Sequence, residues 1–580
     1  MVLLPLVAAV ALVRHAHAST PSANFLFIIV DDLRTQLSGA YGQSGVQTPN
    51  IQRLQEAGVT FTRAYSQVTV CSPARTALLT GMRPNRNRLW TIGPYFRETT
   101  LENGTAIVSL PQALKLAGFN ATGAGKVWHP GTSSGAPGSY GLGAVGGADQ
   151  PYSWSYPVPP GVDPRVLYYD CDAWSNATGA SPASAGIKGG NGCVTTPNCV
   201  ACLESFNATK GLSWAGANCH DSCFVDGMIG DYAVSHLAAP GPTPWSTFLG
   251  FKRPHLVWTV PQTALDLYGK NQTLAAHRLP PEGMPPSGWS YNGEIRSCDD
   301  MGPWVNNSLP GYLGLINDGK HAELRRAYYA AVTATDVQVG RVWNSLQASP
   351  ARNNTWVVLT GDHGWNLGEH GNWAKVTLFE NVARVPLIIV PPSGVPGFLR
   401  NAVIGPDAFV EHLDLFPTIT ELLGVDASLL PAGQLDGRSL VPLLRGEQPA
   451  VNFSAAFSQI TRQIANGPGQ CKGPSDVDSV DPSVSDPPAV SSRAAPLPPC
   501  AMGQSVRVRG FRYTAWTGFN FTSGRADWTD IRGEELYDEP DDGSGDENDF
   551  DANENVNVAD DPAHAAIKAT LLALLQQTMG

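Results

Sequence analysis

Two short apolar runs, each ending at residues that can bind a metal ion, constrain the fold of this 580-residue chain most strongly. Residues 24–30 are almost entirely apolar and lead directly into Asp31 and Asp32, and residues 356–360 lead through a glycine into Asp362 and His363. Short, unbroken apolar runs are typical of strands buried on both faces of an α/β sheet. Open α/β sheets bind ligands at the carboxyl ends of their strands. We therefore predict an α/β fold whose central sheet brings these four side chains together.

The same patterns assign further elements. Apolar residues at helical spacing predict a long helix over 322–346. A second helix is predicted to open with Thr48 as its N-cap and Pro49 as its first residue. The other predicted elements are strands at 121–125, 245–251, 385–390, 506–516 and 535–538 and a terminal amphipathic helix at 563–579.

The chain is too long for one small core, so we expect one large domain and one smaller domain. Hydrophobic residues make up 42% of the chain and charged residues only 15%, with 60 glycines and 47 prolines, which predicts many loops. A change of character after residue 445 predicts a large domain at 19–445 and a C-terminal domain at 446–580. Two stretches read as insertions: 135–223, which is rich in small residues and cysteine, and 467–499, which we expect to be mobile.

The N-terminus has the pattern of a secretory signal peptide. Residues 2–13 are apolar and Ala16-His17-Ala18 suits signal peptidase, so we predict removal of residues 1–18. No later segment reaches the ~20 apolar residues of a membrane span. These features predict a glycoprotein of the secretory pathway, either in a lysosome or vacuole or outside the cell. The candidate glycosylation sites are Asn103, Asn120, Asn176, Asn207, Asn271, Asn306, Asn353, Asn452 and Asn520.

The net charge of -12 argues against nonspecific binding of nucleic acid or of an anionic membrane. A polyanionic substrate would therefore need a local basic site.

Ten cysteines suit an oxidising compartment. If Cys71 is set aside for chemistry, nine remain, so at least one is free or paired outside the chain. Cys199 and Cys202 have the spacing of a zinc pair, but no second pair or histidine follows at metal spacing, so disulfides are favoured. Cys471 and Cys500 could close the second insertion as a loop. The cysteines expected to cross-link the first insertion are Cys171, Cys193, Cys199, Cys202, Cys219 and Cys223.

The segment from Cys71 to Gly81 carries the pattern Cys-x-Pro-x-Arg followed by Leu-Thr-Gly, which resembles the signature of the sulfatase family. Other segments resemble that family in the same order along the chain. They are Asp31-Asp32, 48–54, 125–131, 252–255, 361–375, 414–419, 435–440 and 535–538. Within the family, 125–131 resembles a segment of the iduronate sulfatase branch, and 361–375 is more similar to that branch than to the aryl sulfatases.

This resemblance implies an alkaline-phosphatase-like fold: a large α/β domain with a central mixed sheet flanked by helices, and a smaller α+β C-terminal domain with an antiparallel sheet. It also implies that Cys71 is oxidised by a formylglycine-generating enzyme before folding. The hydrated aldehyde would attack sulfur, and its second hydroxyl would let the sulfate ester on residue 71 collapse without attack by water.

The resemblance further implies one bound divalent cation. Three carboxylates favour a hard ion, so we predict Ca²⁺. His363 stands where many relatives carry asparagine, which leaves another divalent cation open. The predicted ligands are Asp31, Asp32, Asp362, His363 and residue 71.

Five more side chains have implied catalytic roles. Arg75, Lys126 and Lys375 would neutralise charge on the sulfate and on the nucleophile. His255 would protonate the departing sugar oxygen as a general acid. His129 would take the proton from the second hydroxyl of residue 71.

The predicted function is hydrolysis of a sulfated sugar, in particular a uronic-acid 2-O-sulfate within a polysaccharide. Two alternatives stay open. One is another activity of the same superfamily, either an arylsulfatase or a hydrolase of phosphate or phosphonate monoesters. The other is a secreted glycan-binding protein without turnover, although every matched catalytic position carries a competent residue.

Overall fold

The computed structural model describes residues 23–42, 45–92, 94–130, 149, 152–155, 212–241, 244–290, 293–296, 298–304, 316–449, 452–462, 501–539 and 553–580. The predicted signal peptide and the insertion at 467–499 lie outside the described residues, as does most of the insertion at 135–223. So do six cysteines and three candidate glycosylation sites: Cys171, Cys193, Cys199, Cys202, Cys471, Cys500, Asn176, Asn207 and Asn306.

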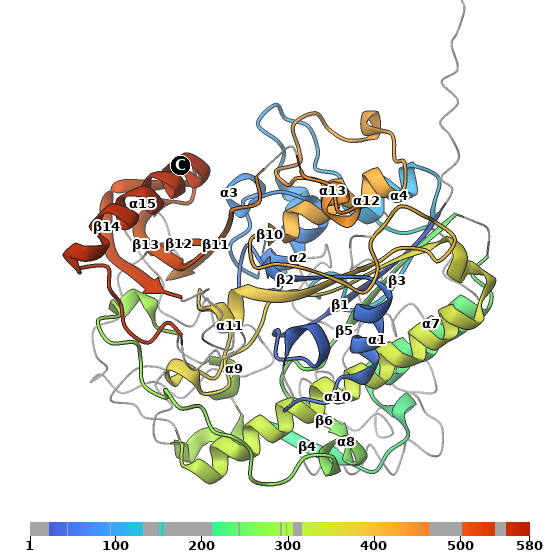
Figure 1. Cartoon of the computed structure of the whole chain (residues 1–580), viewed down its shortest axis with the longest axis horizontal. Helices are drawn as coiled ribbons and strands as arrows, with labels where there is room; N and C mark the ends of the chain where they lie inside the picture. Colours follow the sequence, from blue (N-terminus) through green and yellow to red (C-terminus); the bar gives the residue numbers. More distant parts are fainter. Residues whose placement is uncertain are drawn as a thin grey trace, which may run out of the picture.

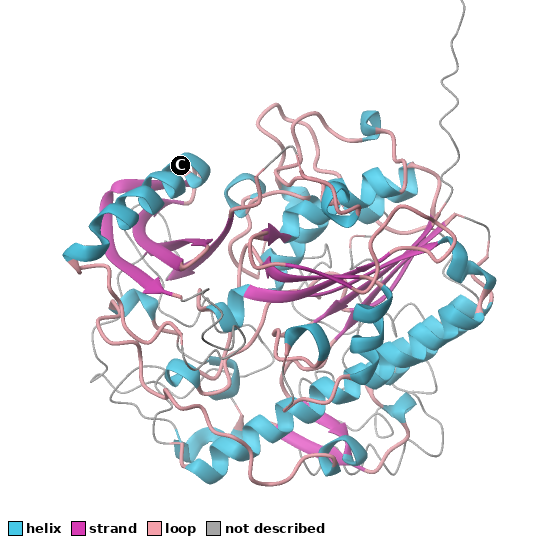
Figure 2. Cartoon of the chain, viewed as in Figure 1, coloured by secondary structure: helices cyan, strands magenta, loops and turns pink. Residues whose placement is uncertain are grey.

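A mixed eight-stranded sheet forms the centre of the molecule (Figures 1 and 2). Its order is β10-β2-β8-β7-β1-β5-β3, with β9 paired to β2. The β3, β5, β1 and β7 strands run parallel, while β8 is antiparallel to both of its neighbours. The strands are β1 (Asn24–Val30), β2 (Val59–Tyr65), β3 (Asn120–Gly125), β5 (Trp245–Phe251), β7 (Thr355–Gly361), β8 (Arg384–Val390), β9 (Ala402–Ile404) and β10 (Val410–Glu411).

The sheet is buried on both faces, which explains its unbroken apolar runs. In β1, Leu26 and Ile28 belong to one hydrophobic cluster, whereas Phe25 and Phe27 belong to the cluster on the other face. Helices α1 (Pro49–Ala57), α7 (Val225–Ala238) and α10 (Asp318–Ala348) cover the first face. Helices α2 (Cys71–Thr80), α4 (Leu110–Leu116), α12 (Leu415–Leu422) and α13 (Val441–Leu444) cover the second face.

The predicted start of α1 is confirmed at Thr48 and Pro49, but the hydrogen bonds that cap the helix come from elsewhere. Thr48 occupies the N-cap position, yet its side chain makes no capping hydrogen bond; its hydroxyl instead bonds to Ser38. The Asp336 carboxylate of α10 accepts hydrogen bonds from the backbone N–H groups of Asn50 (3.1 Å) and Ile51 (2.7 Å). A carboxylate satisfies these orphan donors better than a hydroxyl, so a distant helix replaces the local cap.

The C-terminal region forms a separate four-stranded antiparallel sheet, as predicted (Figure 2). Its strands are β11 (Ala455–Arg462), β12 (Ala501–Val508), β13 (Phe511–Asn520) and β14 (Arg525–Asp538). The terminal helix α15 (Ala565–Met579) packs Leu571, Leu575 and Met579 against this sheet. Shorter elements complete the described fold: β4 (Trp214–Ala217) paired with β6 (Trp258–Pro261), α3 (Pro84–Asn87), α8 (Gln262–Asp266), α9 (Gly293–Arg296) and α11 (Glu380–Ala383).

A buried carboxylate ties the two sheets together. Glu380 of α11 forms ion pairs with Arg63 of β2 (3.2 Å), with Arg507 of β12 (3.3 Å) and with Arg512 of β13, and it accepts the hydroxyl of Tyr65 (2.9 Å). These arginines hold the pKa of Glu380 well below its usual range even though burial opposes the charge.

We expect Glu380→Gln to lower the free energy of unfolding by about 3–5 kcal/mol, because it leaves several buried guanidinium groups without their shared anion. The measurement is the unfolding midpoint by thermal and denaturant titration. Glu421→Gln, an exposed change of the same kind on α12, should shift the midpoint little. Equal midpoints for the two variants would show that this ion cluster does not hold the sheets together.

Among the described residues, no helix combines the length and apolar character needed to cross a bilayer. Cys219 and Cys223 are disulfide-bonded, and the free cysteines of the described part of the chain are Cys71 and Cys298. Of the described glycosylation candidates, Asn120 is half-buried at the start of β3. The exposed candidates are Asn103, Asn271, Asn353, Asn452 and Asn520.

Candidate active site

The ends of β1 and β7 bring the four predicted ligand residues together. These strands are parallel neighbours, with Val30 paired to Gly361, so Asp31-Asp32 and Asp362-His363 leave the sheet side by side. The backbone N–H groups of Asp32 and His363 both donate to Oδ1 of Asp362 at 3.0 Å. Asp32 has a φ of 59°, a left-handed conformation that is costly for a residue with a side chain. Strain of this kind tends to be kept where a site requires one side-chain direction.

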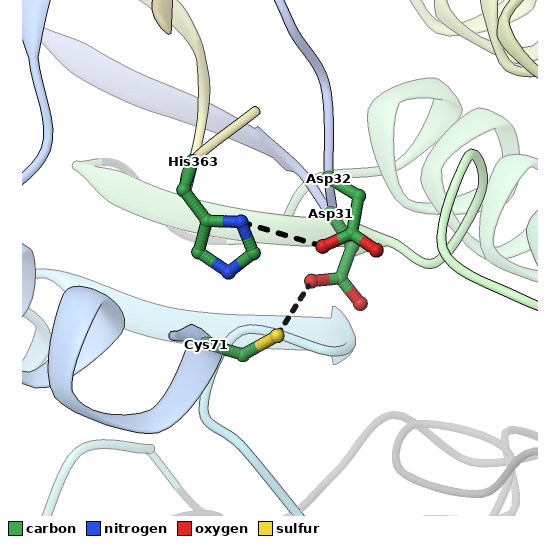
Figure 3. A group of neighbouring side chains, drawn as sticks. All are labelled: Asp31, Asp32, Cys71 and His363. Atoms are coloured by element: carbon green, nitrogen blue, oxygen red, sulfur yellow. Dashed lines mark hydrogen bonds and ion pairs between the residues drawn. The ribbon is translucent and has the colours of Figure 1, made fainter. Parts of the chain in front are cut away.

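Cys71 joins this group from the other face of the sheet. It is the first residue of α2, a helix whose every residue is buried. Its Sγ lies 3.4 Å from Oδ1 of Asp31, and Figure 3 shows Asp31, Asp32, Cys71 and His363 pointing toward one another. Burial, followed by the charge of Asp31, raises the pKa of the Cys71 thiol well above its ordinary value. The unmodified residue is therefore a neutral thiol, which is a poor nucleophile.

Arg75 lies one helical turn after Cys71 and binds two of the carboxylates. Its Nε donates to Oδ2 of Asp362 at 2.9 Å, and a terminal nitrogen donates to Oδ1 of Asp31 at 3.2 Å. A further guanidinium nitrogen donates to the backbone carbonyl of Lys126. Lys126 follows β3, and its Nζ contacts Oδ2 of Asp31 at 2.5 Å. Burial opposes the charge of Asp31, but Lys126 and the other cations outweigh it and lower the pKa of this carboxyl well below its ordinary value.

Lys375 approaches from the loop after β7. Its Nζ lies 3.0 Å from Oδ1 of Asp32, 3.0 Å from Oε1 of Glu294 and 5.4 Å from the centre of the Trp365 ring. Burial opposes its positive charge, but the carboxylates around it raise the pKa of Lys375 well above its ordinary value. Lys375 is thus a fixed cation at the edge of the carboxylate cluster.

The two predicted catalytic histidines are both oriented by backbone carbonyls. Nδ1 of His129 bonds to the carbonyl of Pro130 at 2.9 Å, and Nδ1 of His255 bonds to that of Leu256 at 2.6 Å. Because a carbonyl only accepts, Nδ1 carries the proton in each ring and Nε2 is the atom left for chemistry. Burial and nearby lysines lower the pKa of both rings well below the ordinary histidine value. The neutral form suits His129 as a base, whereas His255 must first be protonated before it can act as an acid.

The donor set fits a divalent cation. Ligand atoms of Asp31, Asp32, Cys71 and His363 all lie within 4.8 Å of one another in a fully buried group. Nε2 of His363 is buried without a hydrogen-bond partner, while Nδ1 of that ring bonds to the carbonyl of Gly364 at 3.1 Å. Burial and the neighbouring carboxylates raise the pKa of Asp32 well above its ordinary value and that of Asp362 to about 6. A bound cation would offset the repulsion within such a crowded carboxylate cluster.

Every predicted site residue therefore lies in or beside one cluster, and the structure adds Glu294. Glu294 belongs to the short helix α9, far in sequence from the other groups. A single glutamate has no spacing that marks it as functional, so no pattern in the sequence could have found it.

The mixed α/β sheet gathers carboxylates, lysines, an arginine and a helix-terminal cysteine at its strand ends, and Asp31, Asp32, Cys71 and His363 among them could hold a metal ion. The sulfatase family model matches residues 23–425. The chain belongs to the sulfatase family and is a sulfatase-family enzyme.

Known proteins similar to the chain agree with this assignment. Iduronate 2-sulfatase of Homo sapiens is 30% identical over 549 residues, which cover 90% of each chain. A sulfatase of Formosa agariphila is 30% identical over 408 residues, which cover 70% of each chain. Among solved structures, a phosphonate monoester hydrolase from Silicibacter pomeroyi aligns with a TM-score of 0.65 at 22% identity, covering 96% of this chain and 94% of the other. That last likeness concerns the fold, which is alkaline-phosphatase-like as predicted.

Proposed function

We propose that this protein hydrolyses a sulfate ester of a uronic-acid sugar, in the manner of a 2-O-sulfatase acting on a polysaccharide, with formylglycine at position 71 and one bound Ca²⁺. The observation that carries the proposal is the environment of Cys71. The buried thiol at this helix N-terminus contacts Asp31 and lies one turn before Arg75, but its raised pKa makes it a poor nucleophile, so a reaction at this position would need a better nucleophile in its place. The 30% identity to iduronate 2-sulfatase over 90% of both chains supports the uronate substrate.

The net reaction adds water to the ester and releases the sugar alcohol and inorganic sulfate. Formylglycine would supply a hydrated aldehyde whose oxygen attacks sulfur. Asp31, Asp32, Asp362 and His363 would hold the Ca²⁺, which would supply positive charge for a sulfate oxygen and for the nucleophile. The protein's own cations surround the same point: Arg75 and Lys126 lie on the Asp31 side and Lys375 on the Asp32 side. Fixed cations in a buried site stabilise the charge that develops as the S–O bond breaks.

Two protons must move during the reaction. The S–O bond to the sugar breaks with its electron pair on the sugar oxygen, and that oxygen takes a proton from Nε2 of His255, which must therefore enter this step with both ring nitrogens protonated. His129, whose Nε2 is free of the Pro130 hydrogen bond, accepts a proton from residue 71 during release of sulfate. Both rings are already held by their Nδ1 atoms, so neither must reorient.

The identity of residue 71 can be tested directly. The protein, purified from a eukaryotic secretory host that converts a known sulfatase, is digested with trypsin, and the mass of peptide 64–75 is measured. We expect an aldehyde in place of the thiol. An intact thiol, or a disulfide, would overturn the proposed mechanism and favour a glycan-binding protein without turnover.

The substrate class needs a second assay. Sulfate esters of 2-O-sulfated uronate disaccharides are compared with matched phosphate and phosphonate monoesters and with aryl sulfates. We expect kcat/KM for the uronate sulfate to exceed the others by at least about 100-fold, or ~3 kcal/mol of differential transition-state binding. Preference for a phosphonate or an aryl ester would replace the proposed substrate while leaving the site unchanged.

We also propose that the protein works in the secretory pathway, in a lysosome or vacuole or outside the cell, after modification by a formylglycine-generating enzyme. The apolar segment at 2–13 and five exposed glycosylation candidates support this location.

A further inference from the structure

Glu294 connects the two ends of the proposed active site. Its Oε1 lies 3.0 Å from Nζ of Lys375 and 3.8 Å from Nε2 of His255. The Lys375 ammonium also contacts Asp32 at 3.0 Å, so a continuous row runs from the metal-site carboxylates through Lys375 and Glu294 to His255. The side chains of His255 and Glu294 are 17% and 14% exposed. They are more accessible than Lys375 and the metal-site carboxylates, which are buried.

The segment that precedes Glu294 in the chain is hydrogen-bonded to the C-terminal sheet. Arg462, at the end of β11, donates to the backbone carbonyls of Ser287 (2.9 Å) and Gly288 (3.3 Å). Further back, the backbone of Glu282 exchanges hydrogen bonds with Asn555 and Asn557. The segment 282–290 is therefore tied to the C-terminal region at several points.

The same segment is also tied to the active-site loop. The Ser290 hydroxyl donates to the backbone carbonyl of Lys375 at 3.2 Å. Val70, Val376 and Leu378, which flank Cys71 and Lys375, pack with Trp516 and Ile460 of the C-terminal sheet. The described segment 282–290, which precedes Glu294 in the chain, is thus bonded both to the C-terminal region and to the backbone of Lys375.

His255, at the end of this row, has charged groups of both signs around its ring. Its Nδ1 is committed to Leu256, so only Nε2 can give a proton to a leaving oxygen. Lysines and carboxylates both lie near the ring, and the Glu294 carboxylate lies 3.8 Å from Nε2. The charged groups that face His255 are Lys126, Lys252, Lys375, Asp31, Asp32 and Glu294.

We propose that Glu294 is a positioning residue: its carboxylate, 3.8 Å from Nε2, stabilises the doubly protonated ring of His255 and keeps Nε2 turned into the active site until the leaving oxygen takes the Nε2 proton. This inference rests on the proposed function. It deepens that function by assigning the protein to sulfate esters of poor leaving groups, such as sugar alcohols. In the step concerned, the S–O bond breaks, its electron pair stays on the sugar oxygen, and the Nε2 proton moves to that oxygen. Glu294 gains and loses no atoms in this step.

The test compares the full-length wild type with Glu294→Gln on a series of phenyl sulfates whose leaving groups become progressively less acidic than 4-nitrophenol. A phenol that leaves easily needs no proton, whereas a poor leaving group does. We expect Glu294→Gln to lose about 100-fold in kcat/KM at the poor end of the series and less than about 3-fold for 4-nitrophenyl sulfate. Glu294→Asp keeps the charge and should recover part of the loss.

A binding measurement separates positioning from structural damage. Titration calorimetry gives the Kd of inorganic sulfate for wild type and for Glu294→Gln. Removing a negative charge beside Lys375 should tighten sulfate binding several-fold, because a dianion is no longer repelled by the glutamate. Disruption of the site would weaken it. Glu282→Gln, an exposed change of the same kind on the same tethered segment, should leave both the leaving-group series and sulfate binding at wild-type values.

The outcomes are distinct. An equal loss on every phenyl sulfate, weaker sulfate binding, or no change in either measurement would overturn the role of Glu294. A wild-type protein that carries the aldehyde at residue 71 but hydrolyses neither the phenyl sulfates nor 2-O-sulfated uronate disaccharides would instead overturn the proposed function itself.

Discussion

Replacing Cys71 by alanine should abolish hydrolysis, lowering kcat by at least about 10⁴-fold, because the attacking group is removed while the rest of the site stays in place. Cys71→Ser should be equally inactive in turnover. A serine has one hydroxyl, whereas the aldehyde hydrate has a second one that expels the sulfate. The side chain at position 71 is also buried against Asp31. The measurement is kcat on the preferred sulfate ester together with the mass of peptide 64–75.

Cys298 provides the matched control for this prediction. It is the other free cysteine of the described residues, and like Cys71 it is buried with a raised pKa. Cys298→Ala should keep activity within about 5-fold of wild type, with the loss limited to packing. A Cys71→Ser variant that turned over at the wild-type rate would show that a simple alcohol suffices and that no aldehyde hydrate is required.

Removal of the divalent cation should have the second largest effect. Chelation is expected to lower kcat/KM by about 10³-fold or more, since a bound cation supplies several kcal/mol of transition-state charge stabilisation. Added Ca²⁺ should restore the activity. Because the ion would bind the folded state, it should also raise Tm by an amount that grows with its concentration. Asp362→Asn should reduce both responses, since Asp362 is the carboxylate that orders Asp32, His363 and Arg75.

Asp336→Asn controls for the loss of a buried carboxylate. Asp336 caps α1 by accepting hydrogen bonds from the backbone of Asn50 and Ile51, which are not predicted metal ligands. Its replacement should lower Tm by weakening the cap but leave the Tm increase on adding Ca²⁺ unchanged. A Ca²⁺ response that survived in Asp362→Asn at full size would place the ion elsewhere. If another divalent metal restored the activity fully and Ca²⁺ restored none, the proposed site would stand and the bound ion would be that other metal.

Much of the fold was predictable because its strands are short, apolar and buried on both faces. The predicted strand at 24–30 has the bounds of β1, and that at 245–251 has the bounds of β5. The predicted helix at 322–346 is α10, which extends further at both ends to Asp318 and Ala348. Its N-terminus is capped by Asn317, a local signal outside the apolar pattern used to find the helix.

The candidate residues were also predictable where they follow a strand or begin a helix. Asp31, Asp362 and Lys126 come directly after β1, β7 and β3, so the order of the sheet brings them together. Glu294 follows no strand and repeats no pattern. Only its approach to Lys375 identifies it.

The class of fold, the family and the chemical character of the site were thus predictable from the sequence, since buried strands and local motifs leave their pattern in consecutive residues. Which distant charges meet depends on how the elements pack. Asp336 of α10, and not the Thr48 side chain, caps α1. Glu380 links the two sheets through its ion pairs, and Glu294 lies between His255 and Lys375. Each is a contact between residues far apart in the chain, formed because a buried charge must find its partner wherever packing places one.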